Sequence, residues 1–120
     1  MAFSRVAGIV RLEGADMPAI ETDGLRFEVE ENPPRGRFKL VNDEGQMLGE
    51  MIFSRARDDL VNIEHTEVDD SLRGKKGGLR LFQGMVAWAR ETKTGITSTC
   101  PFVDRMFDRD PSSRDVLEPS

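Results

Sequence analysis

The stretch that decides the fold runs from Leu60 to Arg90 and reads LVNIEHTEV, DDSLRGKKGG and LRLFQGMVAWAR. Its first nine residues are typical of a strand, because β-branched residues recur and neither glycine nor proline interrupts them. Its last twelve residues predict a helix, because apolar residues recur at a spacing of three and four. The stretch therefore predicts a strand, a turn rich in glycine and lysine, and a helix.

The turn is also unusual in its charge. Between Ser71 and Arg90 the sequence has no acid, and its cations are Arg73, Lys75, Lys76, Arg80 and Arg90. The start of a helix presents unpaired backbone N–H groups and the positive end of the helix dipole, and glycine lets an anion come close. The turn therefore predicts a phosphate site. An ordinary solvated connection and a nucleic-acid patch are the alternatives.

Composition narrows the class of protein. A chain of 120 residues forms one domain with a modest core. The net charge of −5 argues against general binding to nucleic acid, which favours basic domains. No apolar run approaches the ~20 residues of a membrane span, and the first residues lack the pattern of a signal peptide. One cysteine allows neither an internal disulfide nor a zinc site built from thiols, so we expect a reducing, cytoplasmic setting and no metal.

The chain before the turn predicts an antiparallel meander. Apolar and charged residues alternate from Leu25 until Asn32-Pro33-Pro34 ends the first strand. Further strands are expected at 37–41 and 47–53, with the polar segment 54–59 as the turn that leads into Leu60. Residues 1–24 lack a clear pattern, and we interpret them as an N-terminal extension, either a tail or an extra strand, before a domain at 25–118.

The chain after the turn predicts the remaining elements. Asp69, Asp70 or Ser71 can cap the helix, which is expected to run to about Thr94 and to stop at Gly95. The elements expected next are a strand at Ile96–Cys100, a helix at Phe102–Arg109 and a polar tail at Arg114–Ser120. This order predicts an α+β fold, in which two helices pack on a mixed, mainly antiparallel sheet.

Three motifs together resemble the small single-domain branch of the GNAT N-acetyltransferase superfamily. They are His65-Thr66-Glu67-Val68, Arg73-Gly74-Lys75-Lys76-Gly77-Gly78 and Cys100-Pro101, in that order along the chain. The resemblance implies an N-acetyltransferase that moves an acetyl group from acetyl-CoA to a primary amine. It also implies that Thr66, Glu67 and Val68 offer backbone groups to the pantetheine arm, while the second motif holds the pyrophosphate.

One position departs from the family pattern, which has glycine where this chain has Lys76. A Cβ there can obstruct the pyrophosphate or oppose the φ that the loop needs, whereas the ammonium can assist as a charge on phosphate. Gly77 and Gly78 follow at once and can repair the loop by a shift of one residue. This departure keeps a second interpretation open, a CoA-binding or protein-interaction module without catalysis.

Three side chains are candidate catalytic groups. His65 and Glu64 are alternative proton acceptors, because strict alternation places Val61, Ile63, His65 and Glu67 on one face of the strand and Glu64 on the other. Cys100 is either an acyl acceptor or a small apolar side chain that lines the site. The expected partners are acetyl-CoA and an unidentified amine, with no nucleic acid and no membrane. An exposed edge strand leaves a homodimer open.

Overall fold

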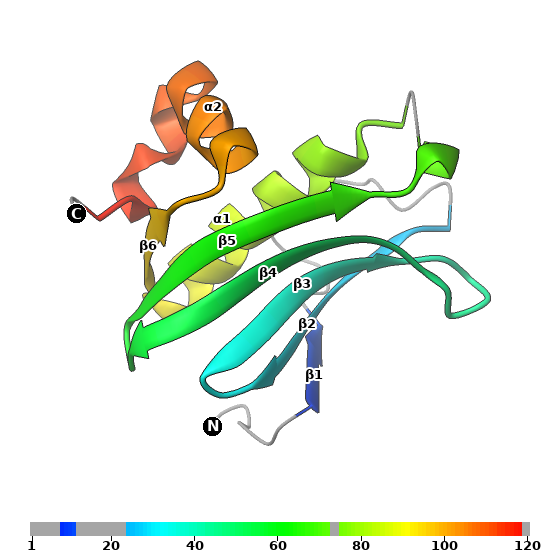
Figure 1. Ribbon diagram of the computed structural model, residues 1–120, viewed down its shortest axis with the longest axis horizontal. Helices are drawn as coiled ribbons and strands as arrows, with labels where there is room; N and C mark the ends of the chain where they lie inside the picture. The colour runs from blue at the N-terminus through cyan, green and yellow to red at the C-terminus, as the bar shows by residue number, and fades with distance from the viewer. Residues whose placement is uncertain (1–7, 12–23, 73–74, 119–120) are drawn as a thin grey trace.

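The computed structural model describes residues 8–11, 24–72 and 75–118. Its six strands form one sheet in the order in which they occur along the chain (Figure 1). They are β1 (Gly8–Arg11), β2 (Arg26–Asn32), β3 (Arg35–Val41), β4 (Met47–Arg57), β5 (Leu60–Val68) and β6 (Gly95–Ser98). Neighbouring strands are antiparallel except β5 and β6, which are parallel. The predicted mixed, mainly antiparallel sheet is confirmed.

Two helices accompany the sheet. Helix α1 (Gly77–Thr92) connects β5 to β6 and lies against one face of the sheet, and α2 (Pro101–Arg109) follows β6 at the end where the C-terminal segment also lies (Figure 1). Short 3-10 helices are η2 (Asp70–Leu72) and η3 (Pro111–Val116). Among the described helices, none is both long and apolar enough to cross a membrane. The predicted α+β class with two packed helices is confirmed.

An aromatic cluster forms the centre of the core between the sheet and α1. The ring of Phe38 lies 5.8 Å from Phe27, 4.9 Å from Phe53 and 5.1 Å from Trp88, measured between ring centroids. All four side chains are buried. Because strand residues alternate between faces, the intervening residues of β2 to β4 lie on the opposite face, where many are charged. One sheet face is therefore apolar and covered, and the other carries ion pairs.

Several predicted boundaries were wrong. Strand β3 begins at Arg35 rather than 37, and β4 continues to Arg57 through most of the predicted turn. The polar residues of that segment form cross-strand contacts that apolar periodicity does not reveal, such as the pair of Arg55 with Glu31. At the other end of the fold, α1 stops at Thr92 because Lys93 adopts a left-handed conformation with φ 58°, and Gly95 begins β6.

The predicted polar tail at Arg114–Ser120 was also wrong for its described part. Arg90 of α1 donates two hydrogen bonds to the carboxylate of Asp115, at 3.0 and 2.7 Å, and these bonds hold the pKa of Asp115 below its ordinary value. Val116 is buried, and the N–H of Glu118 donates to the carbonyl of Ile96. The segment therefore packs on α1 and covers the outer edge of β6.

The N-terminal extension is described only at Gly8–Arg11. These residues form β1 and pair with β2 in antiparallel register, from Gly8 opposite Glu31 to Arg11 opposite Glu28. They supply one edge of the sheet. The rest of the predicted extension, residues 1–7 and 12–23, lies outside the described residues.

Candidate functional site

Strands β5 and β6 part halfway along β5. The parallel pairing runs from Leu60 opposite Gly95 to Ile63 opposite Ser98, and the N–H of Thr99 adds a last bond to the carbonyl of Ile63, at 2.9 Å. On its other side β5 stays paired with β4 as far as Val68. Figure 1 shows β5 continuing after the chain has left β6 for α2. Within the described sheet, residues 64–68 therefore have a strand neighbour on one side only. We call the separation between these residues of β5 and the chain at Thr99 and Cys100 the gap.

A β-bulge marks the point where the strands part. Ile52 of β4 lies opposite His65, whereas the next residue, Phe53, lies opposite Ile63, so Glu64 is an extra residue in β5. An extra residue reverses which face the following side chains occupy. The predicted arrangement, with Val61, Ile63, His65 and Glu67 on one face, was therefore wrong. Val61 and Ile63 are fully buried, but the side chains of His65 and Glu67 are 56% and 69% exposed.

The reversal turns Thr66 and Val68 toward the side of the sheet that carries α1. Thr66 lies opposite the buried Met51, and its hydroxyl is 3.5 Å from the sulfur of Cys100. Cys100 is 3% exposed, carries a free thiol and directly precedes α2. Its N–H donates to the hydroxyl of Ser98 at 3.0 Å, which fixes the backbone where the chain leaves β6. Thr66 and Cys100 therefore face each other from the two sides of the gap.

Glu64 and His65 lie on the opposite face, where α1 does not cover them. The carboxylate of Glu64 accepts a hydrogen bond from the hydroxyl of Ser54 at 2.7 Å and lies 3.5 Å from the guanidinium of Arg35. The imidazole of His65 lies 3.6 Å from the carboxylate of Glu67. The structure thus brings the two predicted proton acceptors to the same face of β5, next to the gap, instead of placing them on opposite faces.

The glycine-rich turn leads from the end of β5 to the start of α1. Arg73 and Gly74, two of the predicted pyrophosphate residues, lie outside the described residues. Lys75 and Lys76 are exposed at the start of α1. The residue that precedes the helix is Lys76, and its side chain makes no capping bond, so the prediction that Asp69, Asp70 or Ser71 caps α1 was wrong. Asp69 instead accepts the N–H of Ser71 at 2.8 Å, and hydrogen bonding by the hydroxyl of Ser71, together with this N–H, lowers the pKa of Asp69.

Gly77 and Gly78 are close to neighbouring elements. A Cβ on Gly77 would lie 2.8 Å from a methyl group of Val68, and one on Gly78 would lie 2.7 Å from the ring of Phe102. Both distances are shorter than real Cβ contacts allow. The two glycines therefore let the start of α1 approach β5 and α2 closely. This close approach places the free N–H groups of the first helical turn beside the open end of the gap.

Lys76 adopts a left-handed conformation, with φ 58° and ψ 43°, at the position where the family pattern has glycine. This conformation costs a residue with a Cβ roughly 1 kcal/mol and costs glycine very little. We expect Lys76→Gly to be more stable than Lys76→Ala by about 1 kcal/mol. Both variants remove the ammonium, so the difference between their free energies of unfolding reports the cost of the left-handed backbone conformation. Urea denaturation measures it, and equal stability of the two variants would contradict a strained Lys76.

Residues 37–116 match the family of GCN5-related N-acetyl-transferases, and this match covers two thirds of the chain. The chain belongs to this family. The match includes β5, the turn, α1 and the gap between β5 and β6, so the predicted GNAT membership is confirmed. No curated protein matches the chain significantly.

One solved structure supports this assignment. A GCN5-like protein from Staphylococcus aureus, determined by NMR as a candidate N-acetyltransferase, is 27% identical, with a TM-score of 0.59 over 82% of this chain and 92% of that one. The crystal structure of nourseothricin acetyltransferase is 22% identical, with a TM-score of 0.42 over 73% of this chain and 69% of that one. The second likeness is too low to add to the argument. The Staphylococcus aureus structure supports the GNAT fold over 92% of its own length.

Two residues beside the gap were not predicted from the sequence. Ser54 and Arg35 both contact Glu64, yet the first lay in a predicted turn and the second before a predicted strand. The sequence holds one signal that could have found Ser54. Residues 53–57 alternate in polarity less clearly than residues 47–53, but no glycine or proline interrupts them, which allows β4 to continue.

Proposed function

We propose that this GNAT-family chain is an N-acetyltransferase that moves an acetyl group from acetyl-CoA to a primary amine. The observation that carries the proposal is the gap between β5 and β6, which opens at a bulge and leads to the start of α1. When bound, acetyl-CoA supplies an activated thioester. The chain's own contribution is to hold this cosubstrate, to orient the amine and to accept a proton.

The residues around the gap fit such a cosubstrate. The edge of β5 at residues 64–68 has backbone groups without a strand neighbour on the β6 side, and such an edge binds an extended chain of amides as an added strand would. Lys75, Lys76 and the N–H groups at the start of α1 suit a pyrophosphate. Arg73 and Gly74 join this set on the sequence motif alone. The proposal thus assigns the pantetheine to β5 and the phosphates to the turn.

The amine must lose a proton as its nitrogen attacks the acetyl carbonyl carbon and the bond from that carbon to sulfur breaks. Glu64 is our first candidate acceptor, because Ser54 and Arg35 hold its carboxylate beside the gap on the uncovered face. His65 is the second, since an imidazole is a common general base and this one is exposed. We assign the polarisation of the carbonyl to backbone N–H groups near Thr66 and Val68.

We assign Cys100 to the wall of the site and not to a covalent step. Its buried sulfur contacts the hydroxyl of Thr66, and direct attack by the amine does not need a second nucleophile. We therefore expect Cys100→Ala to keep its turnover rate within about tenfold of wild type, whereas loss of an essential nucleophile costs 10³-fold or more. Steady-state kinetics of Cys100→Ala and of the matched variant Cys100→Ser distinguishes a side chain that lines the site from an essential nucleophile. An acetylated Cys100 detected by mass spectrometry during turnover, with an inactive alanine variant, would refute this assignment.

The experiment that tests the function has two stages. Calorimetric titration with acetyl-CoA and CoA is expected to give micromolar binding, and a panel of primary amines is then expected to give CoA release. Binding without turnover on any amine would favour the alternative, a CoA-binding module, for which the lysine at position 76 is the specific observation. Absence of binding at high protein concentration would overturn both. A reducing cytoplasmic setting, in which Cys100 stays a free thiol, is part of the proposal.

A further inference from the structure

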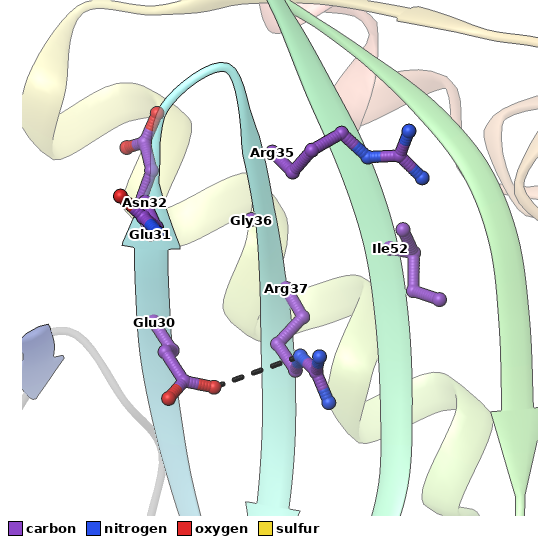
Figure 2. A pocket seen from close by; sticks show the side chains of 7 residues that line it. All are labelled: Glu30, Glu31, Asn32, Arg35, Gly36, Arg37 and Ile52. Atoms are coloured by element: carbon purple, nitrogen blue, oxygen red, sulfur yellow. Dashed lines mark ion pairs between the residues drawn. The ribbon is translucent and has the colours of Figure 1, made fainter. Parts of the chain in front are cut away.

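A hollow lies on the charged face of the sheet, at the turn between β2 and β3. Its volume is about 470 Å³, within the range of small-molecule sites. We call it the hairpin cup. It is lined by Glu30, Asn32, Arg35, Arg37 and Ile52, with the backbone of Gly36 among them. Figure 2 shows the pair of Glu30 with Arg37 on one side of the cup and Arg35 extending across β4.

The acids around the cup already have cationic partners. Glu30 lies 3.6 Å from the guanidinium of Arg37 and 3.7 Å from the ammonium of Lys39. Glu31, which also borders the cup, accepts hydrogen bonds from Arg55. These pairs leave little attraction for a purely cationic ligand. The cup is therefore poorly suited to a polyamine, although the chain as a whole is acidic.

Arg35 is more exposed than the other cations in and beside the cup. Its side chain is 65% exposed, against 43% for Arg37 and 15% for Lys39. Its ion-pair contact with Glu64, at 3.5 Å, is longer than a good hydrogen bond. A planar guanidinium binds a carboxylate through two parallel bonds, so a ligand carboxylate can replace the present contact with a better one. Arg35 is thus the cation most available to an anionic group.

The cup also lies within reach of the reaction centre. Ile52 lines the cup and is paired with His65, while Arg35 itself contacts Glu64. Adjacent strands are about 4.8 Å apart, so β3 and β5 are separated by roughly 10 Å, part of which the arginine side chain spans. A single small molecule can therefore place an anionic group at Arg35 and an amine beside Glu64.

We propose that the hairpin cup selects acceptor amines that carry a carboxylate roughly 5–8 Å from the nitrogen, a separation that follows from the strand spacing. The proposal rests on the proposed acetyltransferase function and adds the substrate class. Arg35 binds the carboxylate and in doing so leaves Glu64, whose carboxylate stays hydrogen-bonded to Ser54 and is then free to receive the proton of the amine. Arg35 is thus a specificity residue, and its partner changes when the acceptor binds.

The first test does not depend on acetyl transfer. NMR titration of the free protein with 6-aminohexanoate is expected to shift the backbone amides of residues 30–32, 35–37 and 52, while hexylamine, which lacks the carboxylate, shifts them at least tenfold less at equal concentration. Arg35→Ala is expected to abolish the difference between the two ligands. The control is Arg57→Ala. The side chain of Arg57 is 61% exposed, similar to that of Arg35, and it also forms one ion pair, with Asp59. Equal shifts from both ligands, or shifts elsewhere, would overturn the proposal.

The second test uses turnover and separates the two proposals. The wild type is expected to acetylate 6-aminohexanoate with kcat/KM at least tenfold higher than hexylamine, and Arg35→Ala is expected to lose that preference through KM while acetyl-CoA affinity stays unchanged. Arg35→Lys is expected to keep part of it. Acetylation of both amines without preference would remove the carboxylate selectivity and leave the acetyltransferase function standing. Failure to bind acetyl-CoA would remove that function, and the titration would still decide what the cup binds.

Discussion

Replacing Gly84 with alanine is expected to destabilise the protein by about 2 kcal/mol, although alanine is the better helix former by about 1 kcal/mol. Gly84 is buried in the middle of α1, and an added Cβ would overlap the ring of Phe27. That ring stacks on Phe38 at 5.8 Å, and Phe38 contacts Phe53 and Trp88. Because the cluster is closely packed, the ring cannot move without disturbing its neighbours. Packing is therefore expected to outweigh helix propensity.

Urea denaturation of Gly84→Ala measures the change in the free energy of unfolding. Gln83→Ala is the control, because Gln83 is the exposed residue directly before Gly84 on α1, and we expect its effect to stay within ~0.5 kcal/mol. A Gly84→Ala variant as stable as wild type, or more stable, would mean that α1 and β2 lie further apart than the structure has them.

The second large effect concerns the cosubstrate. Reversing both charges in Lys75→Glu/Lys76→Glu is expected to weaken acetyl-CoA binding by about 100-fold or more, since each charge-assisted hydrogen bond is worth ~1.5–3 kcal/mol. Both lysines are exposed, so the stability of the fold is expected to change little. Calorimetric titration at low and moderate salt measures the loss. The difference between wild type and variant should shrink as salt screens the phosphates.

Lys93 offers a control for the reversal of one such charge. Like Lys76, it is exposed, borders α1 and has a φ of 58°, but it follows the last turn of the helix instead of preceding the first. Lys93→Glu is therefore expected to leave acetyl-CoA affinity within about twofold, because the negative end of the helix dipole does not attract phosphate. Equal weakening by both variants would mean that net charge, and not the turn, governs binding.

Local pattern predicted most of the fold. The strands at β2, β3 and β5, the helices α1 and α2 and the strand β6 lay where periodicity and turn residues placed them, within a few residues. Two of the errors share one physical origin, because they occur where long-range contacts override local pattern. Arg55 extends β4 through its pair with Glu31, and Arg90 draws the C-terminal segment onto α1 through Asp115. Neither partner is near in sequence, so neither pair is visible from composition.

The candidate site was predictable in its motifs but not in its orientation. Glu64, His65, Thr66 and Cys100 were singled out from the sequence, and the structure brings them to one part of β5 and the chain that follows β6. Strict alternation could not place them, since a bulge leaves no signature that distinguishes Glu64 from its neighbours. The roles of these residues stay predictions until the variants are measured.

The bulge at Glu64 has a consequence for anyone who aligns or redesigns this strand. Deleting Glu64 would shorten the chain by less than one per cent of its length and would leave positions 65 to 68 on their present faces, because Ile63 and His65 would then follow each other in the regular ladder. Straightening the bulge while keeping Glu64 would instead exchange the faces at these positions, so that Thr66 would turn away from Cys100 and His65 would turn toward the core. An alignment with an unbulged strand must therefore leave Glu64 unmatched. A graft of β5 that ignores the bulge would place the side chains after it on the wrong face of the sheet.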